Sequence, residues 1–240
     1  MTDTDAVNSE VQDDSLISIY VGAVPKPLMM PKSILERSSQ YFVKALKHSH
    51  LGTGETNTLR FPEDDLDGWT VVLYWMVNRE VPGEPIEPKA SVYRVLIACW
   101  IMGDRYDMPA FQDVVMMELL NRLDVFSPSM ALVKLAFEST IPGSKLRLVM
   151  AEELGWMIKH GRCGEQCEEL DCCDGILDFT SAIAFAMRPG VDDLASRLPR
   201  ASKPENDRWC EFLIGELSPQ HWIFAHGGKG IPRWQYKGKE

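Results

Sequence analysis

Residues 16–46 decide the fold, and their sequence is LISIYVGAVPKPLMMPKSILERSSQYFVKAL. The run Leu16–Val21 is short, contains β-branched and aromatic residues and is followed by Gly22, which predicts a strand. After a turn that contains prolines, Leu28–Met30 predicts the second strand of a hairpin, and Pro31 closes that strand. The folded part of the chain is therefore expected to begin with two paired strands.

A helix is expected directly after the hairpin, from about 33 to 46. Ser33 and Glu36 have the spacing of a capping box, and apolar residues recur behind them at helical intervals. The segment 56–61 predicts a third strand, which Pro62 ends. Helical periodicity then dominates, and helices are expected over about 66–77, 92–100, 109–123, 128–138, 144–159 and 175–187.

Composition places the chain among ordinary globular proteins. It has 240 residues, of which 45% are hydrophobic and 25% charged, so it can bury a substantial core without disulfides. The net charge of −10 repels phosphate polymers, and nucleic acid is therefore not expected as a partner. No run approaches the roughly 18 apolar residues that a membrane-spanning helix needs, so no membrane partner is expected either.

The N-terminus and the cysteines indicate an intracellular protein, in the cytoplasm or the nucleus. Residues 1–14 carry five acids and no base, which is the reverse of a secretory signal and predicts a disordered acidic tail. Without such a signal, the six cysteines are interpreted as reduced thiols.

The order of the predicted elements resembles that of the BTB/POZ family. Residues 17–49 are similar to the first half of such a domain, with matches at Lys32, Ser33, Ile34 and Leu35 and, after one extra spacing residue, at Arg37, Ser38, Tyr41 and Phe42. The most specific match is the stretch 104–109 (DRYDMP), which resembles the turn after a late helix of the family. Pro31 stands where the family has a histidine, and Asp14 and Ser15 only approximate its acidic residue. The family's charged groove is therefore not transferred to this chain.

The resemblance implies an α+β, helix-rich fold, in which a helical cluster accompanies a small three-stranded sheet. It covers about residues 15–123. The continuation 124–161 resembles the helical C-terminal extension of BTB proteins of filamentous fungi. Residues 162–240 contain cysteines and match no known motif, so neither their fold nor their role is predicted.

The function implied by the resemblance is protein binding rather than catalysis. Members of the family resemble small docking units, many of which form homodimers through the first helix and neighbouring strands. Some act as adaptors of cullin-3 ubiquitin ligases, and others recruit transcriptional regulators. The apolar residues that a second chain could cover here are Met29, Met30, Ile34 and Phe42, and methionine suits an adaptable interface. The alternative is that these four side chains fill the core of a single chain.

A second function is a zinc-stabilised regulatory protein. His160, Cys163, Cys167 and Cys172 could supply the four ligands of a tetrahedral zinc site. Their spacing is not that of a zinc knuckle, and free thiols in a loop explain them as well. No metal or other cofactor is therefore assigned.

Other chemistry-bearing clusters have structural explanations. The carboxylates at 63–65 precede an expected helix, where capping and the helix dipole account for them. The stretch 227–230 (GGKG) lacks the spacing of a phosphate-binding loop. No nucleophile signature surrounds any cysteine, and the acids around Cys167 raise rather than lower a thiol pKa. No catalytic residue is assigned, and the chain is not expected to be an enzyme.

Overall fold

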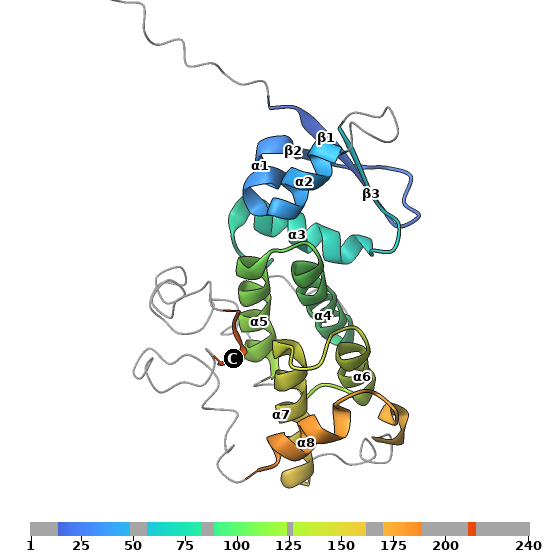
Figure 1. The fold of residues 1–240 in the computed structure, drawn as a ribbon, viewed down its shortest axis with the longest axis vertical. Coiled ribbons are helices and arrows are strands. Elements are labelled where there is room, and N and C mark those ends of the chain that lie inside the picture. The colour runs from blue at the N-terminus through green and yellow to red at the C-terminus, as the bar shows by residue number, and fades with distance from the viewer. Residues whose placement is uncertain are drawn as a thin grey trace, which may run out of the picture. The chain divides into compact units, whose positions relative to one another are not determined.

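The structure is a computed structural model and combines helices with one small sheet (Figure 1). Its described residues are 14–48, 57–82, 89–123, 127–161, 170–188 and 211–214. Among them are eight α-helices and a three-stranded sheet, which confirms the helix-rich α+β fold class. The chain divides into two compact units, with the boundary between Leu66 and Asp67. Most of the expected acidic tail, residues 1–13, lies outside the described residues.

The first unit contains the sheet and two short helices. Its elements are β1 (Leu16–Val21), β2 (Leu28–Pro31), α1 (Lys32–Ser38), α2 (Gln40–His48) and β3 (Thr58–Phe61). The strand order is β2-β1-β3, with β2 antiparallel and β3 parallel to the central β1. The predicted hairpin and third strand are confirmed.

Buried and surface residues alternate strictly along β1, and this alternation separates the two faces of the sheet. Ile17, Ile19 and Val21 are buried, whereas the residues between them reach the surface. Leu35, Phe42 and Phe61 complete the core from α1, α2 and β3, and the rings of Phe42 and Phe61 meet edge to face with centroids 6.5 Å apart. One side of the sheet is thus packed against helices and the other is left at the surface.

The single helix expected over 33–46 is wrong, because the chain breaks it at Ser39. This residue is extended, with φ −163° and ψ 142°. Its hydroxyl accepts a hydrogen bond from the Tyr41 amide at 2.9 Å, and the Ser38 hydroxyl donates to the Ile34 carbonyl at 2.7 Å. Serine side chains offer the backbone such local alternatives to helical hydrogen bonds, and two of them in succession end one helix and start another.

The predicted capping box at Ser33 is replaced by a cap from a distant residue. The carboxylate of Asp14 accepts hydrogen bonds from the Ser33 amide at 3.0 Å and from its hydroxyl at 2.5 Å. The Lys32 amide donates to the Ser15 carbonyl at 2.9 Å. The residues just before β1 therefore satisfy the free amides at the start of α1.

The second unit is helical. Its elements are α3 (Leu66–Asn78, whose first residue precedes the unit boundary), α4 (Lys89–Arg105), α5 (Pro109–Leu123), α6 (Met130–Glu138), α7 (Lys145–Lys159), the 3₁₀ turn η3 (Leu170–Cys173) and α8 (Phe179–Ala186). Aromatic contacts join α3 to its neighbours; the rings of Trp75 and Phe111 have centroids 5.0 Å apart and planes inclined at 47°. Cys99 is fully buried on α4.

The stretch 104–109, which carries the most specific family resemblance, is a helix-ending turn. Asp107 has φ +52°, its amide donates to the Asp104 carbonyl at 3.3 Å, and the Met108 amide donates to the Gly103 carbonyl at 2.8 Å. These two bonds form a Schellman motif, which closes α4 before Pro109 starts α5. Tyr106 is buried beside it against Trp69. The motif is therefore explained by chain reversal and packing.

Helix α7 begins and ends as its sequence predicts. The Ser144 hydroxyl accepts from the Arg147 amide at 3.2 Å, and Gly161 follows the helix with φ +63°. The helix expected over 175–187 is shorter, since α8 begins only at Phe179. Gly175 and Asp178 have positive φ values of 79° and 70°, which are incompatible with a helix over those residues.

In the described part of the chain, no helix has both the length and the apolar character that crossing a bilayer requires.

Candidate functional site

The outward face of the sheet in the first unit is the principal candidate site. Leu16 and Met29 point to this face and are 53% and 50% exposed. In the antiparallel register Met29 lies opposite Ser18, whose hydroxyl is 3.6 Å from the Met29 sulfur, and Pro31 lies opposite Leu16. Directly opposed residues share a face, so these side chains form one corner of it. We call Leu16, Met29 and Pro31 the sheet corner.

A cation and an aromatic ring occupy another part of the same face. Tyr20 lies opposite Arg60 of β3 in the parallel register. The Arg60 guanidinium carbon is 4.5 Å from the centroid of the Tyr20 ring, a cation–π contact. The face therefore offers an apolar corner and a planar, positively charged group, a combination found in protein-binding surfaces.

The four predicted interface residues lie in different surroundings. Met29 is exposed at the sheet corner, and Ile34 is half-buried at the start of α1. Met30 and Phe42 are 5% and 0% exposed, inside the core of the first unit. The structure brings Met29 together with Leu16, which the sequence reasoning did not select. The alternation of Leu16 with the core residues of β1 was the signal that could have identified it.

The predicted zinc ligands are only partly described. Cys163 and Cys167 lie outside the described residues. His160 is exposed and stacks on Trp156, with ring centroids 4.7 Å apart, and a ring nitrogen lies 2.9 Å from the Trp156 carbonyl oxygen. Cys172 is exposed, and its sulfur is 3.7 Å from that of the buried Cys173, whose thiol pKa burial raises to about 12. No three potential ligands converge among the described residues, so the zinc hypothesis stays a prediction.

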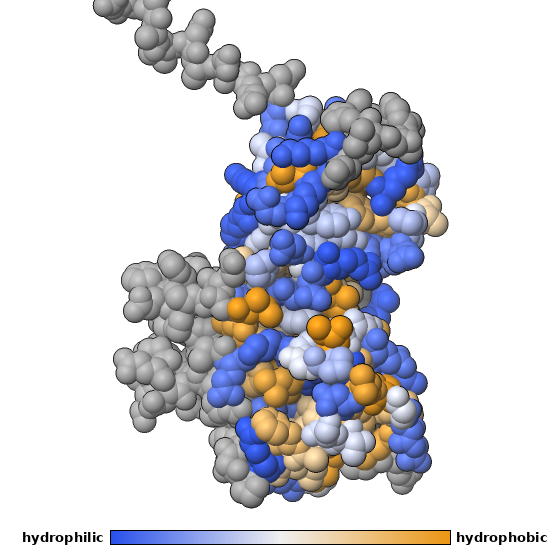
Figure 2. All heavy atoms as spheres, in the orientation of Figure 1, coloured by the Kyte–Doolittle hydropathy of each residue, from blue (hydrophilic) through white to orange (hydrophobic). Residues whose placement is uncertain are grey.

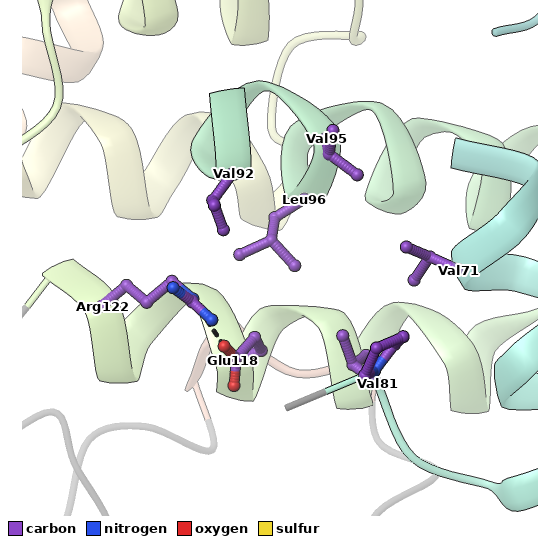
Figure 3. A pocket seen from close by; sticks show the side chains of 8 residues that line it. Val71, Val81, Val92, Val95, Leu96, Glu118 and Arg122 are labelled. Atoms are coloured by element: carbon purple, nitrogen blue, oxygen red, sulfur yellow. Dashed lines mark hydrogen bonds and ion pairs between the residues drawn. The ribbon is translucent and has the colours of Figure 1, made fainter. Parts of the chain in front are cut away.

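A small cavity lies between α3, α4 and α5 of the second unit (Figure 3). Its volume is about 20 Å³, which is room for little more than one water molecule. Its lining is mostly apolar and consists of Val71, Val81, Pro82, Val92, Val95, Leu96, Glu118 and Arg122. This cavity is too small for an organic substrate.

An ion pair forms the polar wall of this cavity. The Arg122 guanidinium donates to the Glu118 carboxylate at 2.5 Å, one helical turn away on α5. Burial raises the pKa of Glu118 to about 7, and Arg122 opposes that rise. The Tyr93 hydroxyl donates to the Arg122 carbonyl at 2.9 Å, and burial also raises the pKa of Tyr93. The bond from Tyr93 to Arg122 joins α4 to α5. A role in holding these two helices together is therefore enough to explain the ion pair of Glu118 and Arg122.

Apolar side chains also gather on the surface of the second unit, around α6, α7 and α8 (Figure 2). Ile141 and Leu177 are 74% and 72% exposed, and Phe185 and Met187 on and after α8 are also exposed. Arg188 covers part of the Phe185 ring, with its guanidinium carbon 3.4 Å from the ring centroid. The described part of the structure does not show what would cover the other exposed apolar side chains of this surface.

In comparisons with known proteins, no protein-family model, no curated protein and no solved structure matches this chain.

Proposed function

We propose that the chain is a protein–protein interaction module of BTB/POZ type, which acts as a homodimeric scaffold or adaptor. The observation that carries this proposal is the sheet corner, where Leu16 and Met29 expose half of their apolar side chains on a regular strand face. Covering such side chains stabilises a complex by roughly 25 cal/mol per Å² of apolar surface removed from water.

The order of elements supports the same proposal. The strand hairpin, the helices α1 and α2, the strand β3 and the helices α3 to α5 follow the order on which the family resemblance rests. The first unit combines a short sheet with the helices α1 and α2, which also agrees with what the resemblance implies. A setting inside the cell, in cytoplasm or nucleus, is part of this proposal, since the six cysteines are interpreted as reduced thiols.

The oligomeric state of a surface variant tests the proposal. Met29→Glu places a charge in the sheet corner, where burial against a second chain would be costly. Gln40→Glu, at the exposed first residue of α2, adds the same charge elsewhere on the first unit and is the matched control. Light scattering after size exclusion should give a dimer for wild type and Gln40→Glu and a monomer for Met29→Glu. A monomeric wild-type protein would contradict homodimer formation.

The adaptor role requires a separate measurement. Purified cullin-3 N-terminal domain, titrated by calorimetry into the full chain, should give saturable binding if the module is a cullin adaptor. Absence of heat at both of two temperatures would reject that role and leave the scaffold role, since a single temperature can fall where the binding enthalpy is zero.

A further inference from the structure

A short segment near the C-terminus is seated on the helices of the second unit. Residues 211–214 are described, and Figure 1 shows this red segment beside α5. Phe212 is 0% exposed and Leu213 is 4% exposed, whereas the flanking Glu211 and Ile214 are exposed. Two consecutive large apolar side chains of this segment are thus buried, as anchor residues of a bound peptide are.

Charged side chains of α5 and α7 hold the backbone of this segment. The Ile214 amide donates to the Asp113 carboxylate of α5 at 2.6 Å. The ammonium group of Lys145, the first residue of α7, donates to the Glu211 carbonyl at 2.5 Å. Both bonds are charge-assisted, and together they bracket the two inserted residues. A hydrogen bond to a backbone group fixes the position and direction of a peptide without selecting its side chains.

The two hydrogen bonds that hold residues 211–214 differ in burial. Asp113 is 0% exposed, so loss of the Ile214 amide would remove a donor from a fully desolvated carboxylate, which is unfavourable. Lys145 forms its bond at the surface. The segment is therefore held most firmly at Ile214 and by the two apolar side chains that precede it.

We propose that α5 and the start of α7 form a peptide-binding groove, which the chain's own residues 211–214 occupy. The groove fits a peptide with two consecutive large apolar residues, followed by a residue with a free backbone amide for Asp113. Proline is excluded at that last position because it lacks the amide hydrogen. This site is separate from the sheet corner and does not depend on homodimer formation.

The strength of the contact makes exchange with another peptide feasible. Burial of two large apolar side chains favours the bound segment, and the cost of ordering the peptide offsets part of that gain. A tethered segment competes at an effective concentration in about the millimolar range, so it masks the groove from a free peptide of modest affinity. A partner peptide would displace this segment if it bound the groove more tightly, or if its concentration exceeded the effective concentration of the segment.

A peptide titration tests the groove in the full chain. The probe is a fluorescent peptide of residues 209–216, with serine in place of Cys210, and its binding is followed by fluorescence polarisation. The double variant Phe212→Ser/Leu213→Ser empties the groove, and it should bind the probe at least about tenfold more tightly than wild type. A control peptide that carries the same two serines should bind neither protein. The matched control variant is Glu211→Gln, which keeps the backbone carbonyl that Lys145 uses.

The outcomes separate cleanly. Equal binding of the probe to wild type and double variant, or no binding to a double variant with native circular dichroism, would overturn the proposal. If the double variant loses its helical signal, Ile214→Pro takes its place. This change removes the amide that donates to Asp113 and fixes φ at position 214, at a residue that is 43% exposed, and it leaves Phe212 and Leu213 in place. Tighter probe binding by Ile214→Pro than by wild type supports the groove, and unchanged binding overturns it.

Discussion

The guanidinium group of Arg147 donates a 2.6 Å hydrogen bond to the carbonyl oxygen of Leu177 and so joins α7 to the loop before α8. The same group donates to the carbonyl oxygens of Phe137 and Thr140 at the end of α6. Arg147 is only 5% exposed; its bond to the Phe137 carbonyl is buried, and its bonds to Leu177 and Thr140 are partly buried. One planar side chain therefore holds three chain segments of the second unit together.

Replacement of Arg147 by methionine should destabilise the second unit by about 2–3 kcal/mol, because one buried and two partly buried carbonyls lose their donor. Urea unfolding followed by circular dichroism measures the loss. Lys134→Met, which breaks an exposed pair with Glu138, is the control and should change the unfolding free energy by less than about 1 kcal/mol. Similar effects of the two variants would contradict the structural role of Arg147.

The Glu118 carboxylate should make the stability of the second unit depend on pH. Burial raises its pKa from 4.5 to about 7, so between these values the folded protein binds more protons than the unfolded chain. The contribution of Glu118 is therefore fully present below pH 4.5 and is lost as the pH rises through about 7. The slope attributable to this group can reach about 1.4 kcal/mol per pH unit.

Urea titrations of wild type and Glu118→Gln across this pH range isolate that contribution, because other groups cancel in the difference. The stability of wild type relative to the variant should fall with rising pH. The exposed Glu138→Gln serves as the control and should show no such trend. A difference that is constant between the two pH limits would refute a raised pKa at Glu118.

Asp14→Ala should destabilise the first unit by removing the cap of α1. The hydrogen bonds from Ser33 lower the pKa of Asp14 below 3.8, so this stabilisation is present above that value and is lost as the pH falls below it. Wild type should therefore melt at a higher temperature than the variant near neutral pH, and the gap should close in strong acid. Glu63→Ala, at an exposed position outside any helix, is the control.

Two helical glycines should respond differently to alanine. A Cβ atom at Gly103 would lie 2.5 Å from Cγ of the buried Gln112, whereas one at Gly155 would meet Ala186 and Met187 at 3.2 and 3.3 Å. Gly103→Ala should cost about 1–3 kcal/mol despite the gain in helix propensity. Gly155→Ala should cost less, since α8 needs to move by only tenths of an ångström. Chemical denaturation of both variants provides the comparison, and the reverse order would be inconsistent with this packing.

The sequence predicted what depends on local pattern. The alternation of buried and surface residues in Leu16–Val21 identified a strand, and Ser144 and Gly161 marked the two ends of α7. It did not predict contacts between distant residues. Asp14 caps a helix through a residue 19 positions away, and Asp113 accepts from an amide 101 positions away. Polar pairings of this kind have no periodicity and become visible only when the chain is folded.

Only part of the candidate site was predicted, because the site also depends on how distant segments pair in the folded chain. Met29 was identified as one of the apolar residues that a second chain could cover, but so were Met30 and Phe42, which the structure buries in the core. Which methionine of a pair faces outward depends on strand register, because a shift of one residue exchanges the two faces. The pairing of Ser18 with Met29 fixes that register.

Hydrogen exchange of the wild-type protein at low and high concentration tests the central claim most directly, because it locates a covered surface without any substitution. Dimer formation through the sheet corner predicts slower exchange in peptides from residues 16–31 at high concentration and unchanged exchange in peptides from α4 and α7. Identical exchange of residues 16–31 at both concentrations, when light scattering shows a monomer at the low and a dimer at the high concentration, would contradict the account.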